Sequence, residues 1–239
     1  MAFITKILLK LLPQLVTSKM AIKFYRSKGI IIGKGTFLFN AGSITIDISR
    51  PLLLEIGEYC KITSGVIILT HDYSRSVLRR VFGEVIGEAR KTIIGDNVFI
   101  GMNSIVLMGT HIGSNCIIGA GSVLHGVIPE NSVVAGNPAR VLCSLDEYYQ
   151  KRKNKSVEEA YFYANLLSSN GKPPTIEQMG AFFPLYLERN RFSLISNNIR
   201  TSLSGDDEED VINQFVDSQP IFSSFEHFLS VAKLHRNVK

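Results

Sequence analysis

Long apolar runs, cysteine pairs and net charge are all scarce in this sequence. No apolar stretch of the 239 residues approaches the roughly 20 that cross a bilayer. Near the start, lysines interrupt the apolar positions and no small-residue cleavage site follows. We therefore expect neither a membrane-spanning helix nor a secretory signal. The three cysteines cannot all pair, so we expect reduced thiols in a cytoplasmic protein.

Charge and histidine spacing argue against two further classes of function. The net charge is only +5, and the basic residues do not alternate with aromatic residues, so we expect no nucleic-acid partner. A modestly basic protein still suits an anionic small ligand or an anionic membrane face. No pair of histidines has ligand spacing on one face, so we expect no metal site.

The sequence does contain a repeat of six residues. Aliphatic residues recur at that interval at Ile94, Ile100, Val106, Ile112, Ile118 and Leu124. This period matches neither a helix nor a simple strand. Glycine follows four of these residues as a permissive backbone position, and compact corner residues stand four places after them, at Val98, Ser104, Thr110, Cys116 and Ser122. Only several flat sides wrapped around one interior bury such a pattern, which predicts a parallel β-helix.

The repeats and the motif that closes them carry a family resemblance. The Ile-Gly-x-x-x-x units, followed by Gly136-Asn137-Pro138-Ala139-Arg140, resemble the left-handed β-helix acyltransferases with hexapeptide repeats. The similarity is closest to the sugar O-acetyltransferase branch, which includes maltose, galactoside and capsule acetyltransferases. This resemblance implies three sides per coil, a left-handed winding and a homotrimer with active sites between subunits. It also implies acetyl-CoA as the acyl donor, with no metal required.

The period of six outlines the predicted β-helix. Residues 29–142 form it, although the register slips around Ile46 to Leu54, where Pro51 disfavours a regular ladder. Ile68 and Ile94 are not separated by a multiple of six, so a charged excursion, about residues 73–91, leaves the β-helix between them. Long insertions in a solenoid commonly serve binding.

Both flanking regions are predicted to be helical. Residues 1–28 read as an amphipathic helix that Pro13 interrupts. This segment either caps the β-helix or lies on anionic lipid, which would add peripheral association with the inner face of the membrane. Residues 143–239 form an α-helical extension, for either packing and oligomer contacts or acceptor recognition. It contains an acidic run at 206–210 and capping boxes at Ser144, Ser156, Thr175 and Ser223.

One histidine has a distinctive position. His71 ends a coil of the predicted β-helix, directly before the excursion. The segment Thr70-His71-Asp72 resembles the one that carries the general base in sugar O-acetyltransferases, which makes His71 the candidate catalytic residue. A neutral imidazole can take the proton of an attacking sugar hydroxyl. Direct attack needs no acyl-enzyme, so Cys60 and Cys116 are expected to be structural.

The other expected site residues follow from the resemblance. The backbone amide of Met102 is expected to stabilise the oxyanion of the thioester carbonyl. Cofactor contacts are expected from Phe99, Gly101, Met102, Gly119, Ala120 and Arg140, the last as a permanent cation near the nucleotide phosphates. Acceptor contacts are expected from Asn40, Asp72 and Tyr73.

We therefore expect an acetyl-CoA-dependent O-acetyltransferase that acts on a sugar hydroxyl. The carbohydrate acceptor is expected to be a bacterial-type surface polysaccharide or its precursor. Two alternatives stay open: an N-acyltransferase of an amino sugar or small amine, and a non-catalytic β-helix scaffold. A scaffold, however, has no need of Thr70-His71-Asp72 beside a charged excursion.

Overall fold

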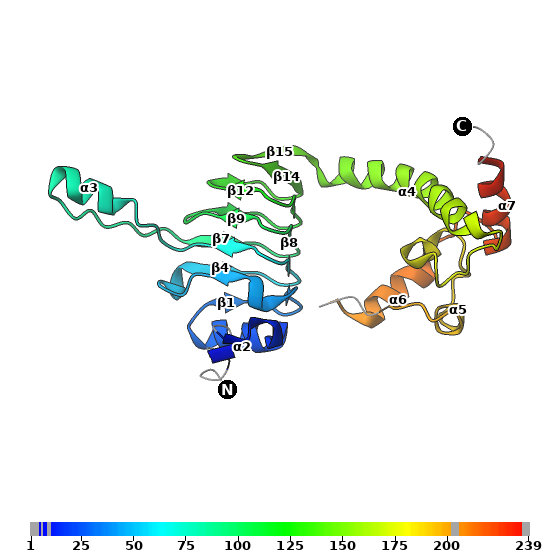
Figure 1. Cartoon of the computed structure of the whole chain (residues 1–239), viewed down its shortest axis with the longest axis horizontal. Helices are drawn as coiled ribbons and strands as arrows, with labels where there is room; N and C mark the ends of the chain where they lie inside the picture. Colours follow the sequence, from blue (N-terminus) through cyan, green and yellow to red (C-terminus); the bar gives the residue numbers. More distant parts are fainter. Residues whose placement is uncertain (1–4, 6, 9–10, 202–205, 236–239) are drawn as a thin grey trace. The chain divides into compact units, whose positions relative to one another are not determined.

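The computed structural model describes residues 5, 7, 8, 11–201 and 206–235. The chain forms two compact units, Met1–Tyr148 and Tyr149–Lys239. The boundary between them falls within a long helix, α4 (Leu145–Leu167). The first unit consists mainly of short parallel strands and the second consists of helices (Figure 1).

The first unit is a three-sided parallel β-helix. Each coil adds one strand to each of three sheets, here named A, B and C. Sheet A contains β1 (Ile31–Ile32), β4 (Leu54–Ile56), β7 (Thr92–Ile94), β10 (His111–Ile112) and β13 (Val127–Ile128). Sheet B contains β2 (Phe37–Leu38), β5 (Lys61–Ile62), β8 (Phe99–Ile100), β11 (Ile117–Ile118), β14 (Ser132–Gly136) and β15 (Ala139–Ser144). Sheet C contains β3 (Thr45–Ile46), β6 (Ile67–Ile68), β9 (Ile105–Val106) and β12 (Val123–Leu124). The predicted fold class, a left-handed parallel β-helix with helices at both ends, is confirmed.

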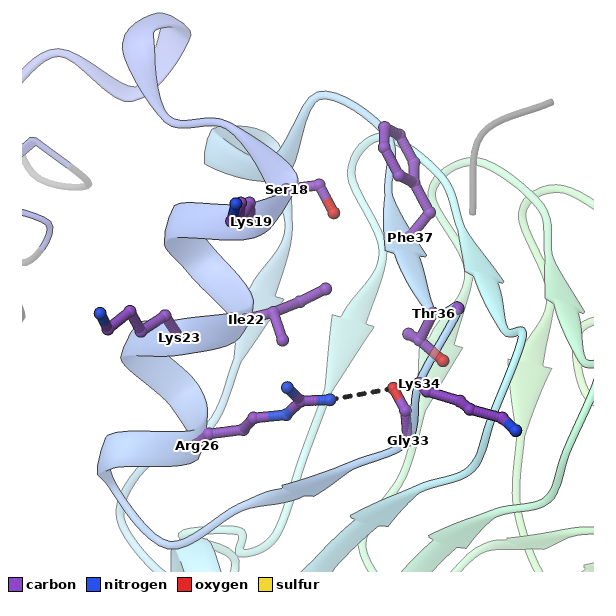
Figure 2. A pocket seen from close by; sticks show the side chains of 10 residues that line it. Ser18, Lys19, Ile22, Lys23, Arg26, Gly33, Lys34, Thr36 and Phe37 are labelled. Carbon is purple, nitrogen blue, oxygen red and sulfur yellow. Dashed lines mark hydrogen bonds between the residues drawn. The ribbon is translucent and has the colours of Figure 1, made fainter. Parts of the chain in front are cut away.

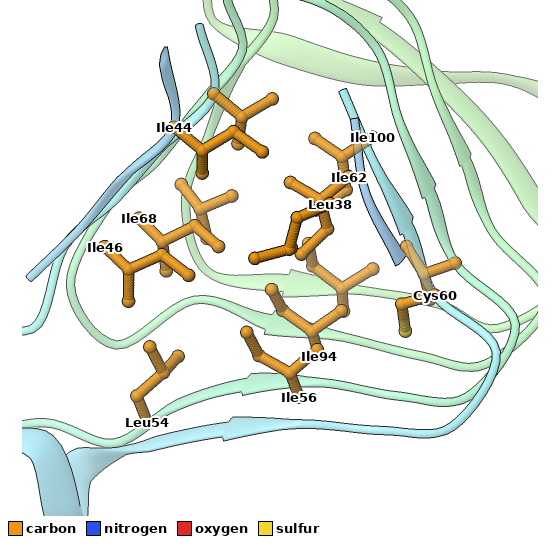
Figure 3. Close-up of a cluster of buried hydrophobic side chains, with 14 of the residues drawn as sticks. Leu38, Ile44, Ile46, Leu54, Ile56, Cys60, Ile62, Ile68, Ile94 and Ile100 are labelled. Atoms are coloured by element: carbon orange, nitrogen blue, oxygen red, sulfur yellow. The ribbon is translucent and has the colours of Figure 1, made fainter. Parts of the chain in front are cut away.

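The repeated aliphatic residues fill the interior of the β-helix. At the interval of six, each is at most 2% exposed: Ile94, Ile100, Val106, Ile112, Ile118 and Leu124. They belong to one core with aliphatic residues of the earlier coils, such as Leu38, Ile62 and Ile68 (Figure 3). Each fully buried side chain of this kind contributes roughly 1.5–3 kcal/mol to the free energy of unfolding. The compact corner residues are buried too, including the free thiols of Cys60 and Cys116.

The repeated glycines have a different role from the predicted one. A Cβ added to Gly101 would lie 2.5 Å from the amide nitrogen of Ala120 in the next coil. This glycine therefore permits close stacking of coils and does not supply a left-handed backbone. Asparagines adopt that conformation instead, with φ of 53° at Asn97 and 58° at Asn115. Their side chains also stack, because Asn97 Nδ2 donates to Asn115 Oδ1 at 2.9 Å.

Helix α2 (Ser18–Ser27) packs on the first coil. Thr17 caps it, since its side chain accepts a hydrogen bond from the amide of Met20. One face of α2 joins the core of the β-helix through Ala21, Phe24 and Tyr25. A 3₁₀ turn at Pro13–Leu15 precedes α2. In the predicted helix over residues 1–28, residues 1–4, 6, 9 and 10 lie outside the described residues.

Both predicted irregular stretches contain helical turns. Between β3 and β4 the chain forms a 3₁₀ turn at Pro51–Leu53. Between β6 and β7 the excursion forms helix α3 (Arg75–Phe82), which extends away from the coils (Figure 1). No residue of α3 is buried. Arg50, at the first irregular stretch, donates a hydrogen bond to the carbonyl of Glu88 in the second and so ties the two together.

The second unit has an aromatic core. Helix α4 begins at a reciprocal capping box, in which the amide of Ser144 donates to Glu147 Oε2 and that of Glu147 to Ser144 Oγ. The box at Ser156 starts no helix, because α4 continues through it. Thr175 and Gln178 cap a turn that leads into a 3₁₀ helix at Gly180–Leu185. The other helices are α5 (Arg191–Ser196), α6 (Glu208–Asp217) and α7 (Phe225–His235). The core includes Tyr186, Phe215, Phe222 and Phe228.

Candidate active site

His71 lies at the corner where sheet C turns toward sheet A, just after β6. Its side chain is 19% exposed, so the imidazole reaches the surface from a mostly enclosed position. Nδ1 lies 2.5 Å from Oδ2 of Asp47. The ring also meets Tyr73 edge-on, with centroids 5.0 Å apart and planes at 84°. These two contacts fix the orientation of the imidazole.

Asp47 is the partner of His71 that the sequence reasoning missed. It directly follows β3, and the pairing of Ile46 with Ile68 brings it to the corner of His71 from the preceding coil. Its carboxylate also accepts hydrogen bonds from the amide and hydroxyl of Thr70 at 3.0 and 2.5 Å and from the amide of Ser49 at 2.8 Å. An acid directly after a buried aliphatic residue, Ile46, was the available signal, but it stands where the register of six slips.

The hydrogen bonds around Asp47 keep its carboxylate ionised. Burial raises its pKa, but hydrogen bonds from Thr70, Ser49 and His71 outweigh that effect and hold the pKa well below the ordinary aspartate value. An ionised carboxylate only accepts hydrogen bonds, so we assign the Nδ1 proton to His71 as the donor. The neutral ring then presents Nε2 as an acceptor, which is the state that a general base requires.

Asp72 and Tyr73 lead from His71 into the excursion. Asp72 accepts hydrogen bonds from the hydroxyl and the amide of Ser74 at 2.6 and 2.9 Å. These bonds lower the pKa of Asp72, with smaller contributions from the charges of Arg90 and Arg75. Tyr73 is 70% exposed, and the Arg75 guanidinium lies 5.8 Å from its ring centroid. The surface beside His71 is therefore polar, with two arginines nearby.

The residues expected to bind the cofactor's thioester arm gather at a different corner, where sheet B turns toward sheet C. They are Phe99, Gly101, Met102, Gly119 and Ala120, in and after β8 and β11. Among the described residues, the amides of Met102 and Ala120 have no hydrogen-bond acceptor, whereas that of Gly101 donates to Ile118. The side chain of Met102 is also 52% exposed. This corner thus presents unbonded amides on successive coils.

Asn40 and Arg140 lie apart from His71 within the chain. Asn40 belongs to the corner between sheets B and C, in the first coil, and its φ of 49° is left-handed. Its backbone carbonyl accepts a hydrogen bond from the amide of Ser43. Arg140 stands in β15, opposite Ala135 of β14, with its side chain exposed. The chain brings neither residue to the corner of His71.

His71 and Met102 lie at opposite ends of the strands of sheet C. His71 follows β6, whereas Met102 precedes β9, and these two strands are neighbours in that sheet. The length of one side therefore separates them, and at roughly 3.3 Å per residue this length is far beyond hydrogen-bond reach. A single chain therefore does not join the histidine and this amide in one site.

The described residues contain no group of three or more histidine, cysteine, aspartate or glutamate side chains arranged to hold a metal ion. Nor does any helix in this part of the chain combine the length and hydrophobicity needed to cross a membrane.

Similarity to known proteins identifies the family. The model for the hexapeptide repeat of succinyl-transferase matches residues 91–125. The putative acetyltransferase YvoF of Bacillus subtilis is 34% identical over 114 residues, covering 47% of this chain and 59% of that protein. The putative lipopolysaccharide biosynthesis O-acetyl transferase WbbJ of Escherichia coli is 47% identical over 55 residues, covering 23% and 28%. Protein CapG of Staphylococcus aureus is 37% identical over 161 residues, covering 64% of this chain and 92% of CapG. The chain belongs to the hexapeptide-repeat acetyltransferases.

As a hexapeptide-repeat acetyltransferase, the protein is an acyltransferase. The segment matched by the family model runs from the residue before β7 to the residue after β12. It includes the corner with the unbonded amides of Met102 and Ala120. Asp47 and His71 lie before that segment, so the family model alone does not reach the histidine corner of this acetyltransferase.

Proposed function

We propose that this protein transfers an acetyl group from acetyl-CoA to a sugar hydroxyl, with His71 as the general base. The observation that carries the proposal is the hydrogen bond between His71 Nδ1 and the buried Asp47 carboxylate. This bond leaves Nε2 free to accept a proton. Acetyl-CoA suits a family named for acetyl transfer, and its thioester is the activated acyl group that an alcohol can attack.

The transfer needs one base and one oxyanion donor. Nε2 of His71 removes the hydroxyl proton while the oxygen attacks the thioester carbon, forming a C–O bond and a tetrahedral oxyanion. Asp47 stabilises the imidazolium that results, through the hydrogen bond it already accepts. Collapse of the intermediate breaks the C–S bond, and His71 returns the proton to the departing thiolate. No covalent acyl-enzyme forms.

The second half of the site comes from another copy of the chain. His71 and the amide of Met102 lie at opposite ends of the strands of sheet C, so one chain supplies only one of them to each site. In a homotrimer, the histidine corner of one subunit can face the amide corner of the next. Coenzyme A then extends along the second corner, with Phe99, Gly101 and Met102 near the thioester, Gly119 and Ala120 one coil further, and Arg140 near the phosphates.

The acceptor is a surface polysaccharide or its precursor. Support comes from WbbJ, whose name refers to O-acetyl transfer in lipopolysaccharide biosynthesis. Tyr73 and Asp72, beside His71, are the proposed acceptor contacts, and Asn40 could contribute only from a neighbouring subunit. A lipid-linked precursor would bring the enzyme to the inner face of a membrane. An N-acyltransferase remains the second candidate, because the same base and amide would serve an amine.

Thiol release from acetyl-CoA tests the proposal. The full chain is assayed with purified surface polysaccharides and, separately, with amino sugars, and the acetylated product is identified by mass spectrometry. Removing a general base lowers kcat by roughly 10²–10⁴-fold, which we expect for His71→Ala. His111→Ala is the matched control, because His111 lies on sheet A, where its ring is hydrogen-bonded to the carbonyl of Lys91. Equal acceptor-dependent turnover by wild type and His71→Ala would refute the role of His71, and faster reaction with amines would favour N-acylation.

A further inference from the structure

Helix α3, in the excursion between β6 and β7, has two opposite faces (Figure 1). Its apolar positions recur at steps of one, three and one residue, which places them on one side of the helix: Val77, Leu78, Val81 and Phe82. Its polar positions recur at the same steps and lie on the other side: Arg75, Ser76, Arg79 and Arg80. The helix is therefore strongly amphipathic.

The apolar face of α3 is open to solvent. Its four side chains are between 38 and 69% exposed. Val85 and Ile86, which follow the helix after Gly83, are 78 and 49% exposed. Isolated apolar residues are common on protein surfaces, but several gathered on one helix face indicate an interaction surface.

Helix α2 is also basic, but it is bound to the coils as α3 is not. Its residues Ala21 and Phe24 are buried in the core of the β-helix. Arg26 Nη2 donates to the carbonyl of Ile32 at 2.6 Å and to that of Gly33 at 3.1 Å (Figure 2). No residue of α3 is buried, so both of its faces remain available to a partner.

Two arginines of α3 have no carboxylate partner among the described residues. Arg79 and Arg80 form no ion pair there, and Glu84, the acid nearest to them in sequence, is bonded to neither. Arg75 is engaged instead, because its guanidinium lies 5.8 Å from the ring centroid of Tyr73. The partner that covers α3 therefore has to satisfy Arg79 and Arg80.

The excess positive charge of the β-helix unit is concentrated on α3. Residues 11–148 contain thirteen lysines and arginines against ten aspartates and glutamates. Helix α3 supplies three of the arginines and no acid, so the two signs are equal in number outside it. The coils of a second copy thus offer no excess negative charge to match this helix.

The interface of an anionic membrane suits both faces of α3 at once. Acyl chains can take up the apolar side, while lipid phosphates beside them accept hydrogen bonds from arginine. The negative surface potential of such a membrane also attracts basic side chains. A short helix with arginines on one side and large apolar residues on the other is typical of segments that lie in this boundary.

We infer that α3 docks this protein on an anionic phospholipid membrane, with its apolar face in the acyl boundary and Arg79 and Arg80 on lipid phosphates. Arg75, where α3 begins, is four residues from His71, so their Cα atoms are at most about 14 Å apart. Docking therefore holds His71 close to the lipid surface, where the sugar of a lipid-linked precursor lies. This last step rests on the proposed function, whereas lipid binding itself requires no acetyl transfer.

Fluorescence can locate the docked helix, because the chain contains no tryptophan. Phe82→Trp places a single fluorophore on the apolar face of α3. With vesicles of phosphatidylcholine and phosphatidylglycerol, we expect its emission to shift to shorter wavelength and its quenching by acrylamide to fall severalfold. Vesicles of phosphatidylcholine alone should cause neither change. Phe192→Trp, at a 77% exposed position of α5, is the matched control and should respond to neither vesicle.

Vesicle flotation of the full chain measures the contribution of each face. Arg79→Gln with Arg80→Gln should bind the anionic mixture about thirtyfold more weakly, because two basic side chains near an anionic surface are lost. Val81→Ser with Phe82→Ser should weaken binding roughly tenfold or more, because less apolar surface is buried in the membrane. All four side chains are exposed, so both variants should fold. Matched pairs at exposed positions of the second unit should bind as wild type does: Lys155→Gln with Lys172→Gln, and Phe192→Ser with Ile195→Ser.

Several results would overturn this inference. If Phe82→Trp already emits at short wavelength without vesicles and does not respond to them, a second copy of the chain covers the apolar face. Equal binding to both kinds of vesicle, or equal losses in the α3 pairs and the matched pairs, would also contradict it.

The docking test and the transferase test can fail separately. His71→Ala should bind vesicles as wild type does, whatever its activity. Val81→Ser with Phe82→Ser should keep its turnover on a soluble acceptor, because neither residue belongs to the proposed active site. Loss of vesicle binding with normal turnover therefore concerns docking alone, and loss of turnover with normal binding concerns the proposed chemistry.

Discussion

The coils from β1 to β6 and those from β7 to β12 build the same β-helix in different ways. The later coils keep the period of six without a break, from Ile94 to Leu124. The earlier coils contain Pro51–Leu53 and give way to the excursion with α3, and these two irregular stretches follow Asp47 and His71 respectively. The regular part presents the unbonded amides of Met102 and Ala120, whereas the interrupted part holds the proposed catalytic pair, Asp47 and His71.

Removing one amide from the regular part should strongly lower turnover. Met102→Pro eliminates the proposed oxyanion donor, and loss of such a donor lowers kcat by roughly 10²–10³-fold. The amide has no hydrogen-bond acceptor among the described residues, so this change breaks no backbone hydrogen bond there. Steady-state kinetics with acetyl-CoA measure the effect, and circular dichroism checks that the variant is folded.

Mixing two inactive variants tests whether the histidine corner and the amide corner meet between subunits. If Met102→Pro and His71→Ala subunits are co-refolded, some interfaces will pair an intact histidine with an intact amide. Activity should then return to a measurable fraction of wild type. No recovery in mixed oligomers, when both variants are folded, would mean that the two corners do not meet between subunits.

In the interrupted part, Asp47→Asn should lower kcat, but by less than Met102→Pro does. Asparagine can offer its own N–H to Nδ1 and so favour the wrong tautomer of His71, which should lower kcat by roughly 10–100-fold, less than loss of the base itself. Because Asp47 positions His71 without touching substrate, KM for acetyl-CoA should stay unchanged. A proportional rise in KM, or a kcat equal to that of wild type, would contradict this role.

Glycine substitutions compare the stability of the two parts. Gly101→Ala places a Cβ 2.5 Å from a backbone nitrogen of the next coil, so we expect a loss of roughly 1–3 kcal/mol in the free energy of unfolding. Gly87, in the excursion, has nothing within 4 Å of an added Cβ, and Gly87→Ala is the matched control. Urea denaturation measures both, and equal stabilities would show that coil stacking tolerates the extra atom.

Acid should lower the free energy of unfolding partly through Asp47. Its folded pKa is depressed, so its contribution to stability is present above the unfolded value, about 3.9, and is lost as the pH falls toward the folded pKa. Asp47→Asn lacks this titration, so its stability should fall less steeply than that of wild type below about pH 4. Thermal melts across the acid range test this, and parallel curves would argue against it.

The coils could be predicted from the sequence because each core position is fixed by local spacing. Asp47 could not, since its pairing with His71 depends on the register of β3 against β6 across an irregular stretch. The role of the glycines was also hidden, because close contact between coils is a tertiary feature. In the helical unit, Ser156 with Glu159 matched a helix start, yet α4 continues through it because nothing there stops the preceding helix.

The antiparallel pairing of β15 with β14 has a consequence for assembly. In a parallel solenoid, the outer edge of the last strand is a template on which another chain could continue the ladder. β15 occupies that edge of sheet B and runs in the opposite direction, so an incoming parallel coil cannot extend the sheet in register. The hairpin therefore protects this end of sheet B from open-ended polymerisation and favours discrete particles over fibres.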